Sequence, residues 1–279
     1  PPGATNRRPG RSPAREDDLI YFDHAATSGV RPAEVVEAVA AALRDAAGNP
    51  GRSGHALSLR AARQLEDART EMAAFLGAAD PSGVVFTKNA TEALNLVLGG
   101  FLREGDAVLA SPWEHNAVMR PLRRLERTRE IELEFLLPAT RPGLLASGLD
   151  LDGLDARLRD RPVRLVALCA ASNVTGIVSD TRAVASLLHA HGALSFWDFA
   201  AAGPYAQIEM CPQGPGQEHA YFDAVFLSPH KFIGGPEGSG RSRVFFGPCA
   251  CSTEIPLAAS APAAPDTAPS IRFRFCGSK

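Results

Sequence analysis

The chain has 279 residues, with 29 Lys and Arg residues against 31 Asp and Glu residues and a formal net charge of −2. This near balance excludes the strongly basic surface on which most nucleic-acid binding depends, so we expect no nucleic-acid partner. Hydrophobic residues make up 45% of the sequence, as in an ordinary globular protein, and the longest nearly apolar run (163–171) is too short to span a bilayer.

The central part of the chain, residues 20–247, alternates helical and strand patterns and predicts one large domain. In chain order we predict helices over 32–47 and 57–76, a strand over 84–87, a helix over 91–102, a strand over 107–110, a helix over 117–126, a strand over 131–137, a helix over 151–158, a strand over 163–169, a helix over 181–191, and strands over 193–197 and 224–227. Strands that alternate with helices and are apolar on both faces indicate a three-layer α/β/α sandwich with a mainly parallel sheet.

The two ends of the chain differ from its centre. Residues 1–19 contain four Pro and four Arg without periodicity, and residues 248–279 contain five Pro and seven Ala. We expect a disordered N-terminal segment and a low-complexity or aberrant C-terminal tail. The odd number of cysteines, five, indicates no disulfide framework and favours a reducing, cytoplasmic location. The Arg-rich start faintly resembles a transit peptide, which leaves organellar targeting as an alternative.

Polar residues follow five of the predicted strands. In parallel α/β sheets, ligands bind at the carboxyl ends of the strands, so these residues are expected to gather on one face. They are Asn89 and Thr91, His115, Asn173, Asp198, and the group Ser228, His230 and Lys231.

The Asn-Ala-Thr-Glu sequence at 89–92 opens a predicted helix. A helix N-terminus offers free N–H groups and the positive end of the helix dipole, and the Thr91 hydroxyl adds a donor, so this turn could hold a phosphate. A plain N-cap is the alternative, because Asn and Thr are common at helix starts.

Asp198 and Lys231 suggest complementary chemistry. A carboxylate at Asp198 could keep a pyridine nitrogen protonated and so turn the ring into an electron sink, or it could simply cap the next segment. Lys231 lies beside Phe232 and Ile233, and partial desolvation would free its amine as a nucleophile for an aldehyde cofactor. An ordinary surface lysine in a turn is the alternative.

His115 could stack on an aromatic ring and transfer protons near neutral pH. The histidines at 189, 191 and 219 are expected to be structural, and those at 24 and 55 are left undecided. The cysteines at 249 and 251 are too close together and lack partners, so no metal site is expected.

Taken together, these residues resemble the class V aminotransferase family, the fold-type I pyridoxal 5′-phosphate (PLP) enzymes that include cysteine desulfurases and selenocysteine lyases. The resemblance extends from about residue 21 to residue 246. It depends on the sequences Phe-Asp-His-Ala-Ala-Thr at 22–27, Phe-Thr-Lys-Asn-Ala-Thr-Glu-Ala at 86–93, Glu-His-Asn at 114–116, Ser-Asn-Val-Thr-Gly at 172–176, Asp198, and Ser-Pro-His-Lys-Phe at 228–232.

The resemblance implies a role for each matching residue. Lys231 would form the Schiff base with PLP, Asp198 would pair with the pyridine nitrogen, and His115 would stack on the ring and assist proton transfer. Phosphate would be bound by Ala90 and Thr91, joined by Ser228 and His230. Asn173 would approach the ring hydroxyl or the substrate carboxylate.

This sequence departs from the family pattern in two ways. Desulfurases usually carry Gln three residues after the Asp, where this chain has Ala201. Family members also continue well past the lysine into a small C-terminal domain, which supplies the substrate-binding arginine and the sulfur-accepting cysteine. The match fades at 238–243, so we expect that domain to be largely missing and do not assign Cys249, Cys251 or Cys276 as the sulfur acceptor.

The expected function is therefore that of a PLP-dependent lyase or transferase acting on a small amino acid, with cysteine desulfurase-like chemistry as the first choice. The resemblance also implies a homodimer. The alternatives are a PLP-binding protein impaired in catalysis and a non-catalytic interaction protein.

Overall fold

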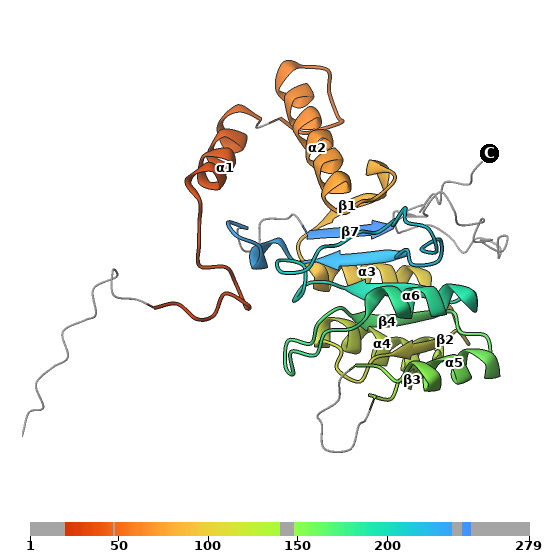
Figure 1. Ribbon diagram of the computed structural model, residues 1–279. Coiled ribbons are helices and arrows are strands. Elements are labelled where there is room, and N and C mark those ends of the chain that lie inside the picture. Colours follow the sequence, from red (N-terminus) through yellow and green to blue (C-terminus); the bar gives the residue numbers. More distant parts are fainter. Residues whose placement is uncertain (1–19, 47, 140–147, 236–241, 247–279) are drawn as a thin grey trace, which may run out of the picture.

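The computed structural model describes residues 20–46, 48–139, 148–235 and 242–246 (Figure 1). The α-helices in these residues are α1 (Ala33–Asp45), α2 (Ala56–Phe75), α3 (Ala90–Phe101), α4 (Asn116–Arg129), α5 (Leu151–Asp160) and α6 (Thr181–Ala190). The strands are β1 (Val84–Thr87), β2 (Ala107–Ala110), β3 (Glu132–Phe135), β4 (Leu165–Cys169), β5 (Leu194–Asp198), β6 (Ala224–Leu227) and β7 (Ser242–Phe246). Each predicted helix and strand is present, with bounds that shift by up to three residues.

The strands form one sheet in the order β1-β7-β6-β5-β4-β2-β3. The neighbouring pairs among β2 to β6 are parallel, and β7 is antiparallel to both β1 and β6. The predicted α/β fold with a mainly parallel sheet is thereby confirmed.

Two separate apolar cores cover the two faces of this sheet. One face packs against α3 and α4, through side chains such as Leu94, Leu98 and Leu122. The other packs against α5 and α6 and the end of α2, through side chains such as Leu154 and Leu188. All five residues of β4 are buried, as expected for a strand covered on both sides.

The four helices that cover the sheet each begin with a side-chain cap. Asn89, His115, Asp150 and Asp180 each accept a hydrogen bond from a backbone N–H in the first turn of α3, α4, α5 and α6, respectively. These caps satisfy donors that the helix itself cannot pair. They also fix the points at which the chain leaves the sheet and enters each helix.

Helix α1 and the first turns of α2 stand apart from the sheet, whereas the end of α2 reaches β1 (Figure 1). No residue of α1 is buried, and in the 20 residues of α2 only Ser58 and Ala73 are buried. None of the described helices is both long and apolar enough to cross a membrane.

Strand β7 is the element that the sequence analysis missed. It lies between β1 and β6, with Val84 paired to Phe245 and Ala224 paired to Phe246. The sequence does not predict this strand, because it opens with Ser242 and Arg243 directly after a Gly- and Ser-rich stretch. The predicted tail at 248–279 and the N-terminal segment at 1–19 lie outside the described residues.

A buried polar cluster joins the last turn of α6 to the amino end of β5. His189 Nδ1 lies 2.7 Å from the carbonyl oxygen of His219, and its Nε2 lies 2.7 Å from Asp223 Oδ2. Asp223 Oδ2 also accepts hydrogen bonds from Ser195 N (2.8 Å) and Oγ (3.2 Å). Each ring nitrogen of His189 therefore lies within hydrogen-bonding distance of an oxygen atom. Tyr221 stacks on the ring at 3.7 Å.

Candidate active site

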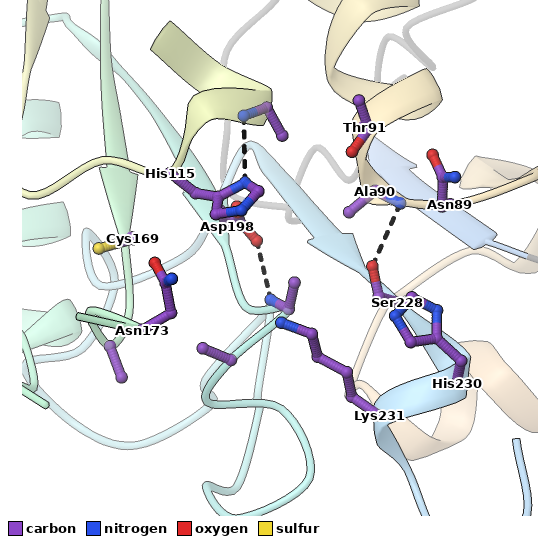
Figure 2. Close-up of a pocket in the computed structure, with 14 residues that line it drawn as sticks. Asn89, Ala90, Thr91, His115, Cys169, Asn173, Asp198, Ser228, His230 and Lys231 are labelled. Carbon is purple, nitrogen blue, oxygen red and sulfur yellow. Dashed lines mark hydrogen bonds between the residues drawn. The ribbon is translucent and has the colours of Figure 1, made fainter. Parts of the chain in front are cut away.

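The carboxyl ends of the central strands meet at a cavity of about 210 Å³. Figure 2 shows the residues that line it as sticks. All eight site residues proposed from the sequence line this cavity, namely Ala90, Thr91, His115, Asn173, Asp198, Ser228, His230 and Lys231. The other lining residues are Asn89, Ala117, Cys169, Ala171, Ala200 and Ala201.

The start of α3 forms one end of the cavity. Asn89 follows β1 and caps the helix, with its Oδ1 accepting a hydrogen bond from Glu92 N at 2.9 Å. The Ala90 N–H donates to Ser228 Oγ at 3.4 Å, which joins the start of α3 to the end of β6 (Figure 2). This end of the cavity therefore combines a helix N-terminus with the hydroxyls of Thr91 and Ser228, a set suited to an anion.

Replacing Asn89 with alanine is expected to lower the free energy of unfolding by about 1 kcal/mol, because the bond to Glu92 N is lost. Denaturant unfolding measures the change. Asn95 lies in the same helix and bonds the Thr91 carbonyl oxygen at 2.8 Å, so Asn95→Ala is the matched control. That control should be neutral or slightly stabilising, because alanine is favoured inside helices. Equal losses in both variants would contradict the capping role.

Asp198 ends β5 at the floor of the cavity and is 5% exposed. Its Oδ1 accepts a hydrogen bond from Ala200 N at 2.8 Å. Burial raises the pKa of Asp198, while the Ala200 bond and the charges of His115 and Lys231 act in the opposite direction. A buried carboxylate of this kind is stabilised by a cation placed next to it.

His115 caps α4 at the side of the cavity (Figure 2). Its Nδ1 accepts a hydrogen bond from Ala117 N at 3.1 Å. In the neutral ring this assigns the hydrogen to Nε2. His115 is thus arranged to donate a hydrogen bond from Nε2 while its ring is held in a fixed orientation.

Lys231 lies in a single helical turn, Pro229–Lys231, that directly follows β6. Its backbone N donates to the Ser228 carbonyl oxygen at 3.0 Å, and Figure 2 shows its side chain extending across the cavity towards Asp198. Gly235 folds back on this turn so closely that a Cβ there would lie 1.7 Å from the Pro229 carbonyl oxygen. The turn that presents the lysine therefore requires a glycine at 235.

The segment before α1 also supports the lysine turn. Ser28 N donates to the His230 carbonyl oxygen at 3.0 Å, and Gly234 N donates to the Val30 carbonyl oxygen at 3.0 Å. These contacts hold the segment before α1 against the lysine turn although the two are far apart in sequence.

Two residues at the site were given no role in the sequence analysis. Cys169 ends β4 and lines the cavity, and Glu114 lies behind it, with Oε1 2.6 Å from Cys169 N. The rule that strand ends carry the site would have found Cys169, whereas nothing in the sequence indicates the contact with Glu114. Burial, with the charges of Glu114 and Asp198, strongly raises the pKa of the Cys169 thiol, so it is a poor nucleophile. Within the described residues, no group of acidic, His or Cys side chains could hold a metal ion.

The fold and the cavity together define the class of protein. A mainly parallel sheet covered on both faces presents a lysine, a buried acid, a histidine and a helix N-terminus at one edge, as in fold-type I PLP-dependent enzymes. The chain belongs to the class V aminotransferase family, whose sequence model matches residues 20–241.

Curated relatives carry the names of desulfurases. The chain is 34% identical over 224 residues to a probable cysteine desulfurase of Methanothermobacter thermautotrophicus, covering 80% of this chain and 52% of the relative. It is 36% identical over 236 residues to a probable cysteine desulfurase of Halobacterium salinarum, covering 82% of this chain and 53% of the relative. The chain thus spans about half the length of these relatives.

Solved structures give the same result. The apo cysteine desulfurase of Thermococcus onnurineus is similar with a TM-score of 0.70 and 29% identity, over 83% of this chain and 54% of that one. The cysteine desulfurase CsdA of Escherichia coli is similar with a TM-score of 0.66 and 29% identity, over 85% of this chain and 56% of that one.

Proposed function

We propose that this chain forms the PLP-binding site of a cysteine desulfurase-like enzyme that acts on a small amino acid. The observation that carries the proposal is the meeting of Lys231, Asp198 and the N-terminus of α3 in one cavity. The names of the relatives support cysteine as the substrate.

The polar groups that line the cavity fit the chemical groups of PLP. The N-terminus of α3, with Ala90, Thr91 and Ser228, suits a phosphate and needs no basic patch. The buried carboxylate of Asp198 suits a protonated pyridine nitrogen, because a neighbouring cation offsets the cost of burying the negative charge. The Lys231 amine suits an aldehyde.

Three further side chains complete the proposed site. His230 adds to the phosphate end beside Ser228, and Asn173 approaches from the opposite wall, as in Figure 2. His115 lines the same cavity as Asp198, with its Nε2 hydrogen available, and would hold or move a proton there. When bound, PLP supplies an electron sink for the carbanion formed at the substrate Cα.

Ala201 also lines the cavity. A methyl group replaces the amide that the family resemblance leads one to expect at this position, so the hydrogen bond that a Gln here would give to the ring oxygen is absent from the proposed site. Asp198 and the phosphate end would then contribute a larger share of the cofactor affinity than in relatives with Gln.

The test is to add PLP to the purified chain and then L-cysteine with a dithiol reductant, and to measure alanine and sulfide. Formation of both in equal amounts supports a desulfurase. Bound PLP without products would instead support a cofactor-binding protein that is impaired in catalysis. Failure to bind PLP would contradict both proposals and leave an interaction protein.

The predicted homodimer and cytoplasmic location stay predictions. Light scattering of the purified chain, with and without PLP, measures the oligomeric state. A monomer under both conditions would contradict the homodimer.

A further inference from the structure

The carboxyl group of Glu114 lies just behind the cavity wall and joins two strand ends. Its Oε1 accepts hydrogen bonds from Ser111 Oγ at 2.5 Å and from Cys169 N at 2.6 Å. Ser111 follows β2, and Cys169 is the last residue of β4. Glu114 therefore ties the loop that carries His115 to the neighbouring strand.

The surroundings of Glu114 do not favour a negative charge. Its Oε2 is inaccessible to solvent and has no hydrogen-bond partner among the described residues, although Glu114 as a residue is only part-buried. No Lys or Arg of the described chain forms an ion pair with it. The titratable groups that face it are Asp198 from β5 and Cys169 from β4, with His115 next to it in the chain.

These surroundings change the protonation of Glu114. Burial raises its pKa to about 8, and the negative charge of Asp198 adds to the rise, whereas the hydrogen bonds from Ser111 and Cys169 oppose it. A neutral carboxylic acid keeps Oε1 as an acceptor for both donors and removes the cost of an uncompensated buried anion.

We propose that Glu114 is a positioning residue that stays protonated in the folded protein and anchors the His115 loop to β4 without placing a second negative charge beside Asp198. The role in cofactor binding rests on the proposed function, whereas the protonation of Glu114 is a property of the cofactor-free chain. With Glu114 neutral, Asp198 would be the one charged carboxylate of this pair and would pair with the pyridine nitrogen without a neighbouring anion.

Protonation of Glu114 has a definite effect on stability. The pKa of this group is 4.5 in the unfolded reference and about 8 in the folded chain. A raised folded-state pKa contributes stability that is fully present below the unfolded value and is lost as pH rises towards the folded value. Between these limits the folded chain binds one more proton than the unfolded chain. Glu114→Gln keeps the shape and the acceptor but cannot titrate.

The first experiment measures denaturant unfolding of the cofactor-free protein from about pH 5 to about pH 8. Asp198 also has a raised pKa. With rising pH the wild type is therefore expected to lose stability through both Glu114 and Asp198, and Glu114→Gln through Asp198 alone. The equilibrium constant for unfolding of the wild type, divided by that of Glu114→Gln, should rise at least about tenfold across this range. The control Glu104→Gln makes the same change at an exposed glutamate and should follow the wild type. Parallel curves for the wild type and Glu114→Gln would overturn the proposal.

The second experiment titrates wild type, Glu114→Gln and Glu114→Ala with PLP and follows the absorbance of the bound cofactor. Glu114→Gln should bind within about threefold of the wild type, and Glu114→Ala should bind at least about tenfold more weakly, because the His115 loop loses its anchor. A tenfold loss in Glu114→Gln would overturn the neutral state, and wild-type affinity in Glu114→Ala would overturn the anchoring role. If the wild type does not bind PLP, the proposed function fails, while the first experiment still decides the protonation of Glu114.

Discussion

Replacing Lys231 with alanine is expected to abolish covalent capture of PLP and to lower any turnover of L-cysteine by about 10³-fold or more, because the nucleophilic amine is lost. Borohydride reduction of the PLP-treated protein, followed by peptide mapping, measures the capture. The sequence has only three lysines, Lys88, Lys231 and Lys279. A stable label is therefore easy to assign, and it should appear on the peptide that contains Lys231.

Lys88→Ala is the matched control for this experiment. Lys88 is exposed and lies between β1 and Asn89, close in sequence to the proposed phosphate turn but not among the residues that line the cavity. The control variant should keep the label and the absorbance of bound PLP. A label that moves to Lys88 or Lys279, or that persists in Lys231→Ala, would contradict the assignment of the lysine.

The second large effect concerns stability. His189→Ala is expected to lower the free energy of unfolding by about 3 kcal/mol, because the buried carboxylate of Asp223 loses a hydrogen-bond partner and the ring stacked on Tyr221 is removed. The side chains of this pair are only 4% and 10% exposed. Denaturant unfolding near neutral pH measures the loss.

His191→Ala provides the comparison, one residue beyond α6. His191 Nε2 contacts Asp155 Oδ1 at 2.8 Å, but these side chains are 21% and 23% exposed. Solvent screens this pair, so the expected loss is about 1 kcal/mol or less. Adding Asp223→Asn to His189→Ala should recover part of the large loss, because the unpaired charge is then removed. Equal losses in the two single variants would show that burial does not determine how much each His–Asp pair contributes to stability.

The sequence predicted the central sheet because its strands are short apolar runs separated by capped helices. β4 is apolar from Leu165 to Cys169 and is entirely buried, so its position inside a doubly covered sheet follows from composition alone. The strand-end rule then placed Asp198 and Lys231 at one edge without knowledge of any contact.

What the sequence did not predict depends on tertiary contacts. β7 carries no strong periodic pattern, and its position is set by pairing with β1 and β6 on either side. The contact between Glu114 and Cys169 N links two strand ends far apart in the chain, and no local pattern encodes it. Likewise, the sequence predicted α1 correctly as a helix that begins near Pro32 but gave no sign that none of its residues would be buried.

The antiparallel strand has a consequence for how the chain is made. In the described part of the chain, β1 pairs only with β7, so Val84 stays without a sheet partner until Phe245 has been synthesised. Long-range pairing of this kind is slow, because a large loop must close before any contact forms. On the ribosome, the strands that carry Asp198 and Cys169 can therefore assemble before β1 docks. A nascent chain halted before β7 would expose the edge of β6 to other chains.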